Sequence, residues 1–395
     1  MDGRRTALIL GAGASFCYED GDGPLPLQKD IVGRLPRISV ASGEGAPDFV
    51  GPNGLGHSRA LAKALHGLFG MPEDSSPDAD RTSFWEELRR RGKTLETVYA
   101  ELDQTVSSQQ RWVLEDFAAI LRTSVRQPIP TREVAHVCRH HRRLASALEP
   151  GDYIVTFNWD SLMADALLYY CPFWYPRTGF GPWQTSAIMA MRSKSFSIQS
   201  LVQLFHIHGS VLLFELLEGG PNSSGTTHYL YLGPPGYSEG NNLMAILGVS
   251  NEHPEPTRNP SEDEQAAVAW GYLHIEGRWF KPVFVPPSFN KGEYVHPYHQ
   301  ALRSRIHALL PTTERYVIIG YSIPEADIDH LSTIFVPTVM RTDAEVRVVD
   351  PSAIDSAFQG RVHEIFPKVK SYDFGNSNFK TFASAAGDDK PSIFA

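Results

Sequence analysis

The chain has 395 residues, 42% of them hydrophobic, which is enough apolar material for a large core and for two or three structural units. Its formal net charge of -9 provides no electrostatic footprint for a phosphate backbone, so we expect no direct nucleic-acid partner. None of its three cysteines forms a Cys-x-x-Cys pair with another. This argues against a zinc site of paired cysteines, favours a reducing, cytoplasmic setting, and leads us to predict no metal.

The first predicted element is a buried strand over Thr6–Leu10, which runs into a tight glycine turn. The strand is too short for a secretory signal or a membrane span, so we expect no membrane association. Residues 37–130 begin rich in Gly, Pro and Ser and continue with amphipathic helical spacing. Apolar residues at three- or four-residue spacing then predict a helix within residues 134–148.

Strand and helix patterns alternate after Gly151. Apolar runs predict strands over residues 152–157, 201–207, 283–285, 316–319 and 346–349. Helical spacing predicts helices over residues 161–170, near 296–310 and near 328–335. An alternation of this kind is typical of a parallel sheet.

We therefore predict an α/β fold, in which residues 1–36 and 131–395 form a Rossmann-like parallel sheet flanked by helices. Residues 37–130 are predicted to form an inserted, mainly helical smaller domain. The range 218–264 is dominated by Gly, Pro, Ser, Asn and acidic residues, so we expect a loop-rich insertion with poor order. Residues 375–395 are predicted to be a polar C-terminal tail.

Gly11, Ala12, Gly13 and Ser15 follow the first strand directly. Glycines let the backbone approach a pyrophosphate, and a helix N-terminus after the turn offers it N–H groups. The dehydrogenase fingerprint requires a third glycine, where this chain has Phe16, and an acidic residue about 20 positions on. A dehydrogenase is therefore disfavoured. The alternative is a glycine turn that serves packing only.

Asn158 and Asp160 lie where the second core strand ends and a helix begins. Open α/β sheets hold their ligands at the carboxyl ends of their strands, so this is a suitable position for a site. The alternative is local, with Asp160 or Ser161 capping the helix and Asn158 forming a turn.

His206 and His208 end the third strand, and Gly209 allows the chain to turn away after the second histidine. A neutral imidazole beside a sugar hydroxyl or a water is a suitable general base near neutral pH. We assign that role to His208 and interpret His206 as structural.

Gly320, Ser322 and Asp350 follow two later strands, again at their carboxyl ends. Ser322 can donate to a phosphate, and Asp350 can accept from an adenosine ribose hydroxyl. Each is equally compatible with an ordinary turn.

Taken in order, five segments of the chain resemble the silent-information-regulator-like (sirtuin-like) family. The segments are residues 8–15 (LILGAGAS), 155–160 (VTFNWD), 206–210 (HIHGS), 285–288 (VPPS) and 319–324 (IGYSIP). They span most of the chain, and they are most similar to the bacterial branch of antiphage defence systems, whose domain consumes NAD+.

The resemblance implies a role for each matching residue. The family's phosphate-binding turn corresponds to Gly11, Gly13 and Ser15, and its Gly-x-Ser element to Gly320 and Ser322. Asn158 and Asp160 would approach the nicotinamide and its ribose. His208 would act on the ribose hydroxyls or on the attacking water.

Two departures separate the chain from the deacetylating members of that family. Those members carry four zinc-binding cysteines in paired spacing, which this chain lacks. They also follow the glycine turn with Gly-x-Pro-Asp-Phe-Arg, where this chain has only Gly23-Pro-Leu-Pro26; Pro47-Asp48-Phe49 comes too late and lacks the arginine. Both departures argue against a peptide substrate.

The resemblance thus implies an NAD+ glycohydrolase that releases nicotinamide and ADP-ribose without a metal and acts as an abortive-infection effector. Such an enzyme must be held inactive until triggered, so we expect a homo-oligomer or a partner such as a HerA-type ATPase or an Argonaute-like protein. The alternatives are a non-catalytic module that binds NAD+ or ADP-ribose and, third, an NAD-dependent protein deacylase.

Overall fold

The computed structural model describes residues 5–16, 64–65, 67–70, 88, 90–105, 113–114, 117–118, 137–174, 179–180, 201–217, 229–232, 244–247, 273–275, 277–285, 297–375 and 377–385. Their centre is a six-stranded sheet in which every pairing is parallel. Its strands are β1 (Thr6–Leu10), β2 (Tyr153–Thr156), β3 (Gln203–His206), β9 (Arg315–Ile319), β10 (Glu345–Val349) and β11 (Ser371–Gly375).

The order across this sheet is β11-β10-β9-β1-β2-β3. When these strands are numbered 1 to 6 along the chain and the sheet is read from β3 to β11, the order is 3-2-1-4-5-6, which is that of the doubly wound Rossmann fold. The predicted fold class is therefore confirmed. The order reverses between β1 and β9, so the carboxyl ends of these two strands mark the point where such sheets hold ligands.

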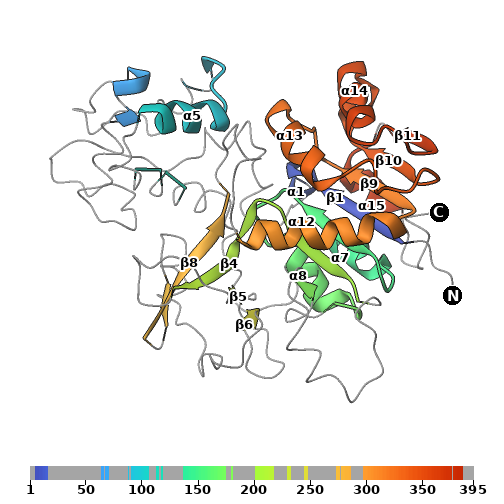
Figure 1. The fold of residues 1–395 in the computed structure, drawn as a ribbon, viewed down its shortest axis with the longest axis horizontal. Helices are drawn as coiled ribbons and strands as arrows, with labels where there is room; N and C mark the ends of the chain where they lie inside the picture. Colours follow the sequence, from blue (N-terminus) through green and yellow to red (C-terminus); the bar gives the residue numbers. More distant parts are fainter. Residues whose placement is uncertain are drawn as a thin grey trace.

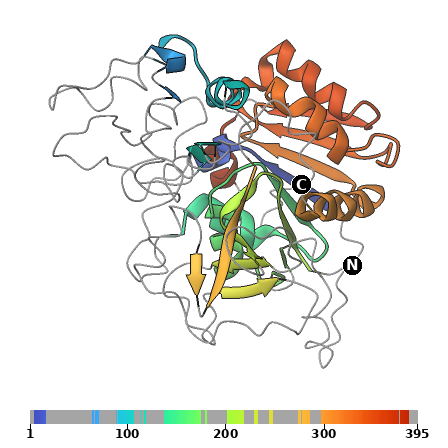
Figure 2. The ribbon, with the colours of Figure 1, turned by 60° about the vertical axis from the view of Figure 1, so that its left-hand side comes forward.

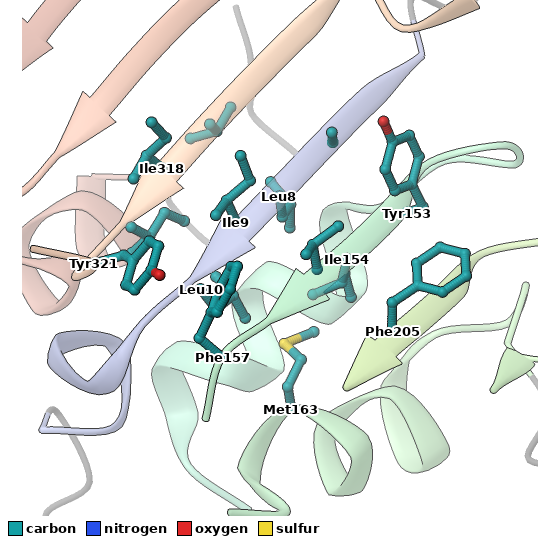
Figure 3. Packing of buried hydrophobic residues seen from close by; sticks show 14 of the residues in the cluster. Leu8, Ile9, Leu10, Tyr153, Ile154, Phe157, Met163, Phe205, Ile318 and Tyr321 are labelled. Carbon is teal, nitrogen blue, oxygen red and sulfur yellow. The ribbon is translucent and has the colours of Figure 1, made fainter. Parts of the chain in front are cut away.

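The central strand β1 is buried throughout because helices cover both faces of the sheet, and its five residues, four of them apolar, are at most 2% exposed. On one side α7 (Arg139–Ala147), α8 (Leu162–Tyr170) and α15 (Phe379–Ala385) pack together. The other group is α12 (Pro297–Leu309), α13 (Glu325–Ile334) and α14 (Ser356–Ile365) (Figure 1). Figure 3 shows apolar side chains of β1, β2 and β9, among them Leu8, Ile154 and Ile318, packed side by side on the sheet.

A second, antiparallel sheet adjoins the first and was not predicted. Its order is β6-β5-β4-β8-β7. Its strands are β4 (Gly209–Leu217), β5 (Tyr229–Leu232), β6 (Met244–Leu247), β7 (Leu273–Ile275) and β8 (Arg278–Phe284) (Figure 2). Only Ile207 and His208 separate β3 from β4, so the third strand of the parallel sheet leads directly into this one.

This sheet corrects one expectation. Residues 283 and 284 of the strand predicted over 283–285 belong to β8 and not to the parallel sheet, because a short apolar run does not distinguish parallel from antiparallel pairing. Within the range 218–264, predicted to be a loop-rich insertion, the structure places β5 and β6, which pair with each other. Their strands are only four residues long and lie among turn-forming residues, which hid them in the composition.

The described part of the predicted helical insertion contains α5 (Leu95–Thr105). The range expected to be a polar tail begins with α15, whose Phe379 is 2% exposed and packs edge-on against His141 of α7 at 5.1 Å between ring centroids. Two buried phenylalanines, Phe379 and Phe382, attach this helix to the core. Among the described residues no helix is long and apolar enough to cross a membrane.

Candidate functional site

The turns after β1 and β9 are joined through their backbones at the point where the strand order reverses. The Gly11 amide donates to the Ile319 carbonyl at 3.1 Å, and the Gly13 amide donates to the Gly320 carbonyl at 2.8 Å. The glycine turn and the Gly-x-Ser element, distant in sequence, therefore form one surface at the carboxyl edge of the sheet.

The glycines at this junction are required by its close packing. A Cβ on Gly11 would lie 2.5 Å from Cα of Tyr321, and a Cβ on Gly13 would lie 2.8 Å from Cα of Gly320. Gly320 has a left-handed backbone (φ +59°), and a Cβ there would lie 2.3 Å from the amide nitrogen of Ala14. Packing between the two turns is thus sufficient to explain the glycines, as the packing alternative expected. Their presence alone is therefore no evidence for a bound phosphate.

The helix expected after the glycine turn is a single turn, α1 (Ala12–Ser15). Gly11 caps it without a side-chain hydrogen bond, and Ala12 is half-buried. The predicted phosphate-binding helix N-terminus is therefore limited to these few residues, and the polar groups at this edge come chiefly from side chains.

Ser15, Asn158 and Asp160 form a buried hydrogen-bonded cluster between β1 and β2. The Asn158 amide nitrogen donates to the Gly11 carbonyl at 2.9 Å and to Ser15 Oγ at 2.8 Å. Ser15 Oγ in turn donates to Asp160 Oδ2 at 2.6 Å. Asp160 Oδ1 accepts from the Leu162 amide at 3.0 Å, so Asp160, which precedes the N-cap Ser161, also binds the first amide of α8, close to the capping role of the local alternative. The structure thus brings together three of the residues predicted for the site.

Burial dominates the electrostatics around this cluster. It raises the pKa of the Asp160 carboxyl, and the hydrogen bond from Ser15 opposes that rise. Asp165, one turn along α8, accepts from Ser161 Oγ at 2.8 Å. Its pKa is raised to about 7, mainly by burial; the Ser161 hydrogen bond opposes this, and the nearby Asp160 charge adds to it. Ionisation of only one of these two carboxyls, Asp160 and Asp165, is therefore favoured over ionisation of both.

His208 lies in a second polar group formed by the end of β3, the turn after β9 and α13. Its Nε2 is 3.9 Å from Oδ1 of Asp327, and both side chains are buried. Asp327 Oδ2 accepts from the Tyr321 hydroxyl at 2.7 Å. The ring of His208 contacts Phe157 edge-on at 5.2 Å and lies nearly parallel to the ring of His330 at 5.8 Å between centroids.

Phe157 connects the two polar groups. It immediately precedes Asn158, and its ring stacks on Tyr321 with centroids 4.3 Å apart and planes 11° apart (Figure 3). Sequence reasoning missed Tyr321, Asp327 and His330. The signal it could have used is the spacing of Asp327 and His330, three residues apart on one face of a predicted helix.

His206 has the environment of a structural residue. It is 1% exposed, its Nδ1 lies 3.5 Å from the Asn158 carbonyl, and its ring stacks on Phe180 with centroids 5.9 Å apart. Burial lowers the pKa of its imidazole to about 4, so the ring stays neutral at neutral pH.

Asp350 and Ser322 lie at the same edge of the sheet but outside the hydrogen-bonded cluster. Asp350 Oδ1 accepts from the Ser352 amide at 2.7 Å and caps a short 3-10 helix, Pro351–Ile354, which is the turn role left open above. Ser322 is exposed, and the next residue, Ile323, is buried with a positive φ of 50°. That backbone is strained for a β-branched residue, so the surrounding contacts must hold this loop in place.

The described residues contain no group of three or more His, Cys, Asp or Glu side chains arranged to hold a metal ion. No protein-family model matches the chain, and no curated protein matches it. One solved structure that it is similar to is "Structure of Sir2Tm bound to a propionylated peptide", with 11% sequence identity, 98% of this chain and 92% of that chain covered, and a TM-score of 0.35. This TM-score is too low to support a fold assignment, so the assignment rests on the strand order.

Proposed function

We propose that this chain binds NAD+ across the carboxyl edge of its parallel sheet and hydrolyses the nicotinamide–ribose bond. The observation that supports this most is the Rossmann strand order together with the residues at its reversal point. Ser15, Asn158 and Asp160 lie there in one hydrogen-bonded cluster, and Phe157 connects this cluster to His208. The sequence resemblance to NAD-consuming sirtuin-like domains involves these same residues.

The chemistry requires little from the protein beyond orientation and a base. Nicotinamide leaves with the electron pair of its bond to ribose, and the oxocarbenium-like transition state needs a positioned water on the opposite face. Water adds to the ribose carbon, and its proton goes to His208 as general base. The products are nicotinamide, ADP-ribose and one proton.

Asn158 can take only a restricted part in this reaction. Its amide hydrogens already donate to Gly11 and Ser15, so the group that it can offer a ligand is its carbonyl oxygen, an acceptor for a ribose hydroxyl or a water. Asp160 acts through Ser15 and the start of α8, and so holds the turn in place. We assign Ser15, with Gly11, Ala12 and Gly13, to the pyrophosphate.

The opposite end of NAD+ would lie toward β9 and β10. Gly320 forms the turn that packs on Gly13, and we assign Ser322, which is exposed, to a phosphate. Asp350 would accept from the adenosine ribose, for which its Oδ2 is the candidate atom because Oδ1 caps the following turn. The NAD+ molecule would then extend across the reversal point.

Control of the activity is proposed from the sequence resemblance alone. An NAD+ glycohydrolase that acts as an abortive-infection effector must be inactive until triggered, by assembly into a homo-oligomer or by a partner such as a HerA-type ATPase or an Argonaute-like protein.

The test is an NAD+ hydrolysis assay in which released nicotinamide is measured for the wild type, Asn158→Ala and His208→Ala, with and without co-expressed genomic neighbours. We expect both variants to lose activity. His363→Ala is the matched control, because this histidine is exposed and packs on Tyr372 of β11, at the far edge of the sheet from β3. Intact NAD+ under every trigger tried would refute the proposal.

A non-catalytic module that binds NAD+ or ADP-ribose is the second candidate. The observation that favours it is the use of Asn158 and Asp160 in hydrogen bonds within the protein. This candidate predicts binding without turnover. Loss of the biological effect in Asn158→Ala with ligand affinity retained would count against it.

A further inference from the structure

A carboxylate buried beside the candidate base has no part in the function proposed above. Asp327 lies in the first turn of α13 and is 2% exposed. Removing an ionised carboxylate from water is costly unless each oxygen meets a donor or a positive charge. Here Oδ2 accepts from the Tyr321 hydroxyl at 2.7 Å, while Oδ1 faces Nε2 of His208 at 3.9 Å.

Tyr321 fixes this carboxylate from one side. Burial and then the negative charge of Asp327 raise the pKa of the Tyr321 hydroxyl well above its ordinary value, so it remains a donor at every physiological pH. The tyrosine itself cannot move freely, because its ring stacks on Phe157 and its Cα lies against Gly11. Asp327 is thereby held with its other oxygen toward the imidazole.

Two rings contact His208 and limit its orientation. Phe157 meets it edge-on at an interplanar angle of 81°, and His330 of α13 lies at 23° to it. Two titratable groups of α13, Asp327 and His330, face the imidazole. Tyr321 acts through Asp327.

We infer that Asp327 is the positioning residue of His208. A carboxylate beside Nε2 favours the proton on that nitrogen and leaves Nδ1 as the acceptor, because the partner of one ring nitrogen determines the state of the other. When Nδ1 takes a proton from a water or a ribose hydroxyl, the imidazolium forms beside the carboxylate of Asp327. The distance of 3.9 Å suits such a role, since catalytic hydrogen bonds are often long before the substrate binds.

The catalytic consequence rests on the proposed function, whereas the contact with His208 is testable without it. The primary measurement is an NMR titration of the ¹⁵N-labelled imidazole of His208, assigned with His208→Ala, in wild type and in Asp327→Asn. The substituted amide keeps an oxygen for the Tyr321 hydroxyl but removes the charge. We expect the midpoint of the His208 titration to move to lower pH by about one unit or more.

Asp329→Asn is the matched control. It makes the same chemical change on the same helix, but Asp329 is exposed, and we expect the His208 midpoint to stay unchanged. An unchanged midpoint in Asp327→Asn would overturn the inference. If that variant fails to fold, the wild-type spectrum provides the test. At pH values above the midpoint, the inference requires the proton of the neutral His208 ring to be on Nε2. A proton on Nδ1 would overturn the inference.

The enzymatic measurement separates the two proposals. If the chain hydrolyses NAD+, Asp327→Asn should lower kcat by about tenfold or more with little change in KM, because a misplaced base loses part of its contribution. If the wild type leaves NAD+ intact, the proposed function fails while the titration still tests the role of Asp327. A kcat equal to that of wild type together with a displaced midpoint would limit Asp327 to setting the charge of His208, which refutes its positioning role.

Discussion

Asp165 of α8 should make the protein less stable as the pH rises from about 4 to about 7. Its side chain accepts a hydrogen bond from Ser161 Oγ, while its Oδ1 is buried and has no hydrogen-bond partner among the described residues. Burial raises the pKa of this carboxyl from 3.8 to about 7. The folded state therefore binds the proton more tightly than the unfolded chain, and the stability present below pH 3.8 is lost progressively up to about pH 7.

The size of the effect follows from the difference between these two pKa values. Each pH unit between them costs about 1.4 kcal/mol, so a difference of about 3 units corresponds to about 4 kcal/mol of unfolding free energy. Asp165→Asn retains the oxygen for Ser161 and has no charge at any pH. We expect the variant to exceed the wild type by up to about 4 kcal/mol at about pH 8, and to match it within about 1 kcal/mol at about pH 4.

Urea unfolding followed by circular dichroism at these two pH values measures the difference directly. Taking the variant minus the wild type removes the contributions of other titrating groups, which the two proteins share. A difference that is the same at both pH values would show that Asp165 is hydrated or already ionised, and would refute the reasoning.

Four further substitutions test the packing and hydrogen bonds described above. Gly320→Ala places a Cβ 2.3 Å from Ala14 N and should lower the free energy of unfolding, measured with denaturant, by about 1–3 kcal/mol. In Gly360→Ala, on α14, the added Cβ meets open space, so this control should raise the free energy of unfolding by about 0.5–1 kcal/mol. A change of the same sign in both variants would contradict this. Ser15→Ala leaves Asp160 Oδ2 without its donor and should cost about 1–3 kcal/mol of unfolding free energy. Phe379→Ala should cost about 3–5 kcal/mol and raise hydrogen exchange in α15; unchanged exchange would show that the helix is held elsewhere.

The strands of the parallel sheet could be predicted where burial on both faces makes them continuously apolar. β1 was predicted over its observed residues, and the predictions for β9 and β10 differ only at their first residue. β11 was missed, because this edge strand (Ser-Tyr-Asp-Phe-Gly) is partly exposed and has no such apolar run. The antiparallel sheet was missed because its strands are short or interrupted by a bulge between Gly209 and Phe214.

In the candidate site too, some residues could be predicted from the sequence and others could not. Ser15, Asn158 and Asp160 could be placed together from sequence because each follows a strand of one parallel sheet, and parallel strands end at one edge. Asp327 could not, because its position beside His208 depends on the orientation of α13 across the sheet. No local pattern encodes that orientation.

The sheet order also has a consequence for how the chain folds. Leu8, in the central strand, pairs with Ile154 on one side and with Val317 on the other. During synthesis β1 leaves the ribosome before β2, and β9 follows only after all of β2 to β8. Until then a largely apolar strand has an unpaired edge, which is a template for aggregation. We therefore expect folding to be slow and late, and fragments that end before β9 to be insoluble even though they contain the whole glycine turn.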